Sequence, residues 1–184
     1  MRHPHQLVRS DSVLVVVDVQ DKLLHAIQDW QEVLANTVKM IKFAQELSVP
    51  VLVTEQYPKG LGPTNLSVKE LFSDFYAIEK TAFSCLGAEN FYDRLLSLEK
   101  KSLVLVGIEA HICVLQTALE AMSRGFHVHI ISDAVGSRRM GNKLLGLDKI
   151  KNAGGIISGV EIALYEWLEY AGSDEFKAVL PLIK

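Results

Sequence analysis

The sequence predicts an α/β fold with a mainly parallel sheet, and three observations lead to this expectation. Short runs that are almost wholly apolar and rich in Val and Ile recur along the chain, as is typical of strands covered on both faces. Stretches with apolar residues at helical spacing separate these runs, and such alternation favours parallel strands joined by helices. The chain has 184 residues, of which 49% are hydrophobic, so we expect one compact domain with a sizeable core.

Six runs are expected to form the strands, and helical patterns lie between and after them. In chain order the strands span 12–18, 49–54, 75–80, 102–108, 126–132 and 154–159. The helices are expected at 29–48, 88–98, 112–124, 141–152, 159–170 and 173–183. Asp29 and Ser173 are candidate N-caps for the first and last of these helices. The longest irregular stretch, 55–67, contains two prolines and two glycines and is a natural wall or lid for a binding site.

Charge and composition exclude several classes of protein. The formal net charge is −3 and no basic block is present, so the electrostatic footprint of a nucleic-acid-binding protein is missing. No apolar run approaches the roughly 20 residues that span a bilayer, so no membrane partner is expected. The first residues, MRHPHQLVRSDS, lack the hydrophobic segment of a secretory signal. With two distant cysteines, this pattern predicts a cytoplasmic protein, although the early arginines leave a mitochondrial location open.

Three reactive side chains fall at the carboxyl ends of expected strands. Asp18 ends the first strand, Lys80 ends the third, and Cys113 follows the fourth in the first turn of a helix. In open parallel sheets these ends meet at one edge, where ligands bind. Unpaired N–H groups and the helix dipole are expected to lower the pKa of Cys113. Alone, each residue has an ordinary interpretation as a turn cap, a surface lysine or a small buried hydrophobe; together they predict a thiol nucleophile with Asp18 as its base.

The segments VVVDVQ, EKTAFSC and VLVGIEAHICVLQTAL resemble the isochorismatase-like cysteine hydrolase superfamily, which includes nicotinamidases and N-carbamoylsarcosine amidases. The resemblance covers 12–168 and is closest to the isochorismatase domain-containing proteins. It implies a three-layer α/β/α sandwich, with a Rossmann-like six-stranded parallel sheet and helices on both faces. It also implies an Asp18–Lys80–Cys113 triad and a homo-oligomer, either a dimer or a tetramer. Residues 1–184 would then form a single domain, with 1–11 as an N-terminal extension and 171–184 as a C-terminal helical segment.

The resemblance further implies a cis peptide bond between Ile108 and Glu109. This bond would aim the backbone N–H groups of Glu109 and Cys113 at a developing oxyanion. Nicotinamidases carry metal-binding histidines on the loop after the second strand, whereas the matching TEQYPKG has none, so we expect no metal and no cofactor. Isochorismatases usually lack the cysteine, so Cys113 indicates acyl chemistry on a small amide, ureido or related carbonyl substrate.

Other residues near the strand ends are candidates for the substrate pocket. They are Gln20, Leu23, Gln56, Tyr57, Phe83 and His111. His111 has even chances of facing the pocket or pointing away from it. His127 and His129 share a strand face, as a pair of metal ligands can, but without a third ligand nearby a packed or surface strand pair is favoured.

The leading hypothesis is therefore a cysteine hydrolase that cleaves a C–N bond through a thioester acyl-enzyme. A second hypothesis is a catalytically silent binding or scaffolding protein that keeps the fold. A third is a redox role with Cys85 as the partner of Cys113, which requires the two sulfurs to reach disulfide geometry.

Overall fold

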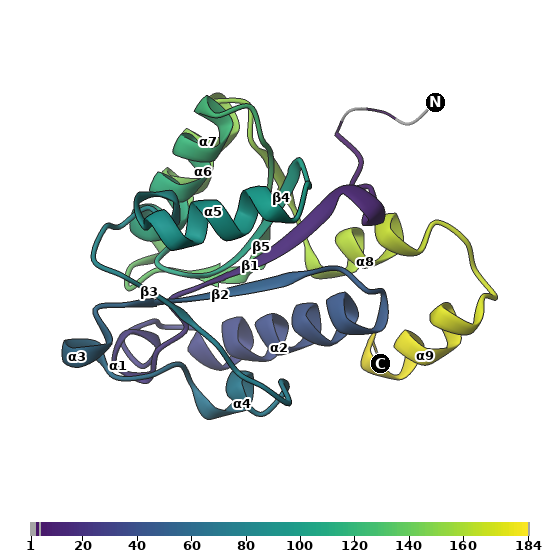
Figure 1. Cartoon of the computed structure of the whole chain (residues 1–184), viewed down its shortest axis with the longest axis horizontal. Coiled ribbons are helices and arrows are strands. Elements are labelled where there is room, and N and C mark those ends of the chain that lie inside the picture. The colour runs from purple at the N-terminus through teal and green to yellow at the C-terminus, as the bar shows by residue number, and fades with distance from the viewer. Residues whose placement is uncertain (1–2, 4, 184) are drawn as a thin grey trace.

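The computed structural model describes residue 3 and residues 5–183, and its centre is a six-stranded sheet (Figure 1). The strands are β1 (Ser12–Val17), β2 (Val51–Gln56), β3 (Ile78–Lys80), β4 (Ser102–Ile108), β5 (His127–Gly136) and β6 (Ile156–Ser158). Their order is β3-β2-β1-β4-β5-β6, and all neighbours are parallel. The chain reverses its direction of travel across the sheet between β1 and β4, and ligands bind beside strand ends at such a switch point.

All six expected strands are present, but their lengths differ from the prediction. The two edge strands, β3 and β6, each pair with one neighbour over three residues and are shorter than the apolar runs that predicted them. An edge strand that stops early presents fewer unpaired backbone groups. In contrast, β5 continues four residues past the predicted end at Ser132, because its last part pairs with β4 beyond a shift in register.

Nine α-helices connect and cover the strands in the described part of the chain. They are α1 (Asp21–Leu24), α2 (Trp30–Glu46), α3 (Pro58–Leu61), α4 (Leu66–Lys69), α5 (Glu89–Ser97), α6 (Leu115–Ser123), α7 (Met140–Asn152), α8 (Val160–Leu168) and α9 (Asp174–Ile183). Short 3₁₀ turns lie at η1 (Arg9–Asp11) and η2 (Cys85–Gly87), and a π-helical turn lies at η3 (Ala110–Val114). The stretch 55–67, expected to be irregular, contains α3 and the start of α4.

The helices form two layers around the sheet, so the expected three-layer α/β/α sandwich is confirmed. Figure 1 shows α5, α6 and α7 on one side of the sheet and α2 and α9 on the other. Every residue of β1 is buried, and alternate side chains enter the two different cores. Val15 packs in the core under α5 and α6, whereas Val16 packs in the core that includes Trp167 of α8. This two-sided burial explains the unbroken apolar run of β1.

The end of β1 depends on a glycine in the neighbouring strand. Gly107 of β4 pairs with Val17 and has a φ of 108°. A Cβ at this position would lie 2.1 Å from the backbone oxygen of Val17, a distance that no side chain tolerates. The close approach lets β4 lie tight against the last residue before Asp18, which itself adopts a left-handed φ of 52°.

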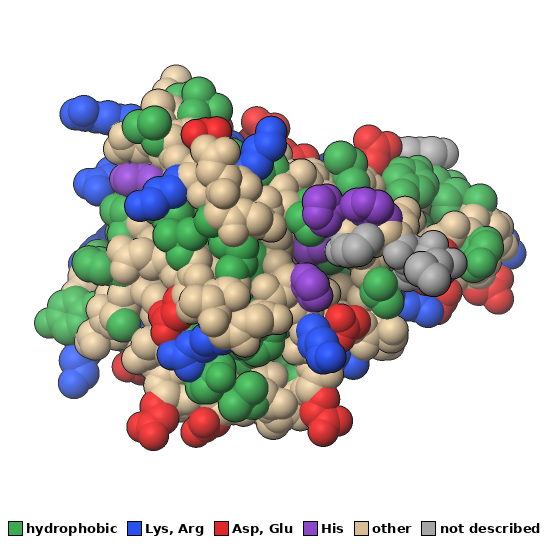
Figure 2. All heavy atoms as spheres, turned by 90° about the horizontal axis from the view of Figure 1, so that it is seen from above, with side chains coloured by type: hydrophobic (Ala, Val, Ile, Leu, Met, Phe, Trp, Pro, Cys, Tyr) green, Lys and Arg blue, Asp and Glu red, His purple; other side chains and the backbone are tan. Residues whose placement is uncertain are grey.

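His129 of β5 is buried, whereas His127 at the start of the strand is exposed. Histidine side chains gather on one face of the molecule (Figure 2), but no group of three or more His, Cys, Asp or Glu residues among the described part of the chain is placed to hold a metal. Burial lowers the pKa of His129 to about 4, and the positive charges of His127 and His5 act in the same direction. Of the two residues, His129 is therefore packed in the interior and His127 lies at the surface.

Acidification is expected to weaken the fold through His129. Between its unfolded pKa of about 6.5 and its folded pKa of about 4, the unfolded chain binds a proton that the folded chain does not, so stability falls as the pH falls. From pH 7 to pH 4.5 this group should remove about 2 kcal/mol of unfolding free energy. Urea unfolding at both pH values measures it. The loss should shrink in His129→Leu and persist in His127→Gln; an equal loss in all three proteins would contradict the assignment.

Candidate active site

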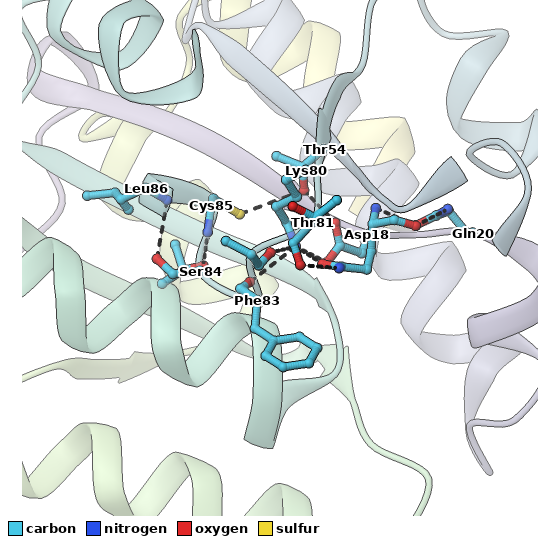
Figure 3. A network of polar contacts seen from close by, with 12 residues as sticks. Asp18, Gln20, Thr54, Lys80, Thr81, Phe83, Ser84, Cys85 and Leu86 are labelled. Atoms are coloured by element: carbon cyan, nitrogen blue, oxygen red, sulfur yellow. Dashed lines mark hydrogen bonds and ion pairs between the residues drawn. The ribbon is translucent and has the colours of Figure 1, made fainter. Parts of the chain in front are cut away.

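The carboxyl ends of β1 and β3 and the turn after β4 carry the three predicted catalytic residues. Lys80 ends β3, and its Nζ donates a hydrogen bond of 2.7 Å to Oδ2 of Asp18, directly after β1 (Figure 3). Both side chains are fully buried in this ion pair. Because β2 lies between β1 and β3, the lysine chain must reach across the end of β2. The structure therefore brings Asp18 and Lys80 together as the strand ends predicted.

The Lys80 ammonium is surrounded by acceptors. Besides Asp18, it donates to Oε1 of Gln56 at 2.7 Å and approaches the backbone oxygens of Phe83 at 3.1 Å and Ala82 at 3.3 Å. Burial lowers the pKa of Lys80, but the negative charge of Asp18 and smaller contributions from the two cysteines outweigh it, so the pKa is raised. Lys80 therefore stays a cation in a dry position, where its charge acts strongly on its neighbours.

Asp18 has a donor on each carboxylate oxygen. Oδ2 faces Lys80, and Oδ1 accepts a hydrogen bond of 2.7 Å from the hydroxyl of Thr54. The whole residue is buried with no exposed surface. Burying a carboxylate is costly unless it is paired and hydrogen-bonded, and Asp18 has both a cationic partner and a hydroxyl donor. Thr54 was not among the residues predicted from the sequence; its only signal was a hydroxyl within an apolar strand that ends beside Asp18.

Cys113 lies in the π-helical turn η3, immediately before α6, and is 6% exposed. Burial, the charge of Asp18 and a hydrogen bond to that carboxylate together raise the pKa of its thiol to about 12, against the lowering effect of Lys80. The expectation of a lowered pKa is thus wrong for this structure, because desolvation and the adjacent carboxylate outweigh Lys80 and the helix start. At neutral pH Cys113 therefore rests as a thiol, under the influence of the Asp18 carboxylate.

The backbone before Cys113 is fixed by a polar cluster. The Ile108–Glu109 peptide bond is cis, at the position that the resemblance implied. The buried Glu109 carboxylate accepts hydrogen bonds from the backbone N and the Nε of Arg138, with an Nε to Oε1 distance of 3.0 Å. His111 contacts Oγ of Ser137 at 2.9 Å through Nδ1. Arg138 thus keeps an exposed side chain but anchors the start of the turn that carries Cys113.

The predicted pocket residues fall into two groups. Tyr57 and Phe83 are exposed, at 54% and 53%, while Leu23 and His111 are partly buried. Gln20 and Gln56 are buried and form a clamp: the Gln20 amide donates to the backbone oxygens of Gln56 and Gly62 and accepts from the Gln56 backbone N. Gln56 reaches the triad through Lys80, whereas Gln20 holds the loop after β2 in place.

Two cavities differ in their distance from these residues. One of about 390 Å³ reaches Lys80 along the outer edge of β3 and is also lined by Tyr57, Glu79 and Asn90. A larger one, of about 650 Å³, lies between the residues before β1 and helix α8, away from the triad. Of these two cavities, only the first is bordered by one of the three predicted catalytic residues, Lys80.

No helix in the described part of the chain is long and apolar enough to cross a membrane. Both cysteines are free thiols. Cys85, in η2, is fully buried, and burial raises the pKa of its thiol to about 11.

Comparison with known proteins places this chain in the isochorismatase family. A family model described as the isochorismatase domain matches residues 12–162. A secreted isochorismatase effector from Phytophthora sojae is 37% identical over 97% of this chain and 87% of its own length. Human isochorismatase domain-containing protein 2 is 35% identical over 97% of this chain and 86% of its own.

Solved structures agree with the fold. A Caenorhabditis elegans protein described as MAR1 ribonuclease has a TM-score of 0.90 and 35% identity, covering 97% of this chain and 92% of its own. YcaC from Escherichia coli, described as an octameric hydrolase of unknown specificity, has a TM-score of 0.91 at 23% identity, over 100% of this chain and 91% of its own.

Proposed function

Because this chain belongs to the isochorismatase family, whose fold supports hydrolase chemistry, we propose that it is a cysteine hydrolase acting on a C–N bond. Its substrate is a small amide, ureido or related carbonyl compound, and the reaction passes through a thioester on Cys113. The observation that carries this proposal is a buried, hydrogen-bonded Lys80–Asp18 ion pair, whose carboxylate raises the pKa of the Cys113 thiol. Such a group is the base that a protonated thiol requires.

In the first half of the reaction, Sγ of Cys113 attacks the carbonyl carbon while Asp18 accepts the thiol proton. Lys80 stabilises the charges nearby, and the backbone N–H groups of Glu109 and Cys113 are proposed to bind the oxyanion. Asp18 then gives its proton to the departing nitrogen as the C–N bond breaks. In the second half, Asp18 deprotonates a water molecule that attacks the thioester, and the thiol regains its proton as the acid is released.

Trapping the acyl-enzyme tests this proposal. The protein is incubated with a panel of small amides and ureido compounds, quenched in acid and analysed by peptide mass spectrometry. We expect an acyl adduct on the peptide that contains Cys113 and none on the peptide with Cys85. Cys113→Ala should abolish both adduct and turnover, a loss of at least about 10³-fold for a missing nucleophile. Turnover that survives in Cys113→Ala would overturn the mechanism.

The alternative function is a catalytically silent binding or scaffolding protein. It predicts that no compound in the panel is turned over and that Cys113 forms no acyl adduct.

A nuclease role, suggested by the description of the Caenorhabditis elegans relative, has little support here. Binding of nucleic acid depends on positive charge that neutralises phosphates. This chain has a net charge of −3, and on the face in Figure 2 basic and acidic side chains are interspersed.

Assembly and compartment are also proposed. We propose that residues 1–184 act as a single domain within a homo-oligomer, since α7 exposes Met140, Leu144 and Leu145, and a relative is described as octameric.

We propose a cytoplasmic location, because both cysteines are free thiols in the interior of the protein. A relative described as secreted shows that the family itself does not fix the compartment.

A further inference from the structure

Thr54 occupies a central position beneath the catalytic carboxylate. Its hydroxyl donates to Oδ1 of Asp18 at 2.7 Å and lies 3.7 Å from Sγ of Cys85. All three residues are fully buried, and Figure 3 draws the contacts between them as dashed lines. Water is therefore not available to replace any of these contacts, and each lost contact leaves a buried polar group without a partner.

The direction of the hydrogen bonds follows from the single hydroxyl proton of Thr54. Since that proton is donated to Asp18, the contact with Cys85 has the thiol as donor and the Thr54 oxygen as acceptor. Cys85 retains its proton at neutral pH because burial raises the pKa of its thiol to about 11. The network is thus ordered from Cys85 to Thr54 to Asp18.

Cys85 also connects this network to the helix of the nucleophile. Its backbone N donates to Oγ1 of Thr117 at 2.9 Å. Thr117 lies in α6, four residues after Cys113, so both lie on one side of the same helical segment. Through Cys85 and Thr117, the carboxylate of β1 is tied to the segment that presents the thiol.

We propose that Thr54 and Cys85 are positioning residues that hold the Asp18 carboxylate toward Cys113. A carboxylate held only at Oδ2 by Lys80 is free to rotate about that contact, whereas a second donor on Oδ1 fixes its plane. The inference rests on the proposed function, because that function gives Asp18 its role as base. It assigns the second cysteine to support of the site and gives it no redox part.

The test follows alkylation of Cys113 by iodoacetamide at pH 8, with peptide mass spectrometry separating the two cysteines. In the wild type, the charge of Asp18 and its hydrogen bond raise the pKa of Cys113. If Thr54→Val frees the carboxylate to turn away, this pKa falls, and Cys113 should be alkylated about tenfold faster, since one pKa unit changes the thiolate fraction about tenfold. Thr54→Ser keeps the hydroxyl and should stay within about twofold of the wild type.

Three comparisons separate positioning from a loosened fold. In an Asp18→Asn background, Thr54→Val should have no further effect, because its action passes through the carboxylate. Thr37→Val removes a buried hydroxyl that donates to the Val33 backbone oxygen within α2, and should leave the rate unchanged. Cys85 should remain unlabelled throughout, since general loosening would expose it as well.

Several results would overturn the inference: an unchanged rate in Thr54→Val, the same acceleration with and without Asp18, or the same acceleration in Thr37→Val. Cys85→Ala should also accelerate Cys113 alkylation, and an unchanged rate in that variant would remove Cys85 from the proposal.

The alkylation readout needs no substrate, so it separates this inference from the proposed function. If the Thr54 effect is found but no acyl-enzyme forms with any compound, positioning stands and the proposed function fails. If turnover is found without any Thr54 effect, the proposed function stands and positioning fails.

Discussion

An Asp18→Asn variant is expected to lose hydrolysis while its Cys113 thiol becomes more reactive toward iodoacetamide. In the wild type, the pKa of Cys113 is raised to about 12 by burial, by the charge of Asp18 and by a hydrogen bond to it, against the effect of Lys80. Replacing the carboxylate with an amide removes two of the raising causes and leaves the lysine. The pKa should therefore fall, and below that pKa each unit increases the thiolate fraction about tenfold.

Hydrolysis should move the other way. Asp18 is the proposed acceptor of the thiol proton and the base that activates water for deacylation, and a positioned base contributes about 10²–10⁴-fold. A loss of about 10³-fold in turnover of any substrate found in the panel is expected, because both halves of the reaction use Asp18. Two measurements on the same preparation test this: the alkylation rate at pH 8 should rise and turnover should fall.

Asp148→Asn is the matched control, because Asp148 is an exposed carboxylate on α7. It should leave both rates within about twofold of the wild type. If Asp18→Asn instead slows alkylation, the carboxylate activates the resting thiol, and the protonation state assigned to Cys113 is wrong. If turnover is unchanged, Asp18 is not the base.

The fold was largely predictable because its signals are local. β1 is buried on both faces, so all its residues after Ser12 are apolar. Such unbroken apolar runs can be recognised in the sequence without knowledge of the fold. Strand ends then place Asp18 and Lys80 at one edge without any knowledge of side-chain contacts. The lengths of β3 and β6 were not predictable, because the number of residues that pair depends on the neighbouring strand.

The electrostatics of the site could not be predicted from the sequence. The helix start near Cys113 is a local feature, and it indicated a lowered thiol pKa. Desolvation and the distance to Asp18 are tertiary properties, and they raise that pKa instead. The contact of Thr54 with Asp18 could not be predicted for the same reason, since it depends on which side chain lies beside the hydroxyl in the folded protein.

Lys80→Met is expected to cause the largest loss of stability among these variants. Methionine has a similar length but no charge, so Oδ2 of Asp18 and Oε1 of Gln56 lose their 2.7 Å donor. The carboxylate is then a buried charge without its cationic partner, although Thr54 still donates to its Oδ1. Breaking a buried ion pair from one side typically costs about 3–5 kcal/mol of unfolding free energy.

The double variant Asp18→Asn/Lys80→Met distinguishes the unpaired charge from the other lost contacts. With the carboxylate neutralised, replacing the lysine no longer isolates a charge, so the double variant should recover at least about 1–2 kcal/mol relative to Lys80→Met. Urea unfolding at pH 7 measures all three proteins. Lys177→Met is the control, since the exposed pair of Lys177 with Asp174 should contribute less than about 1 kcal/mol. A double variant no more stable than Lys80→Met would mean that the amide and carbonyl acceptors, rather than Asp18, are the main partners that the lysine stabilises.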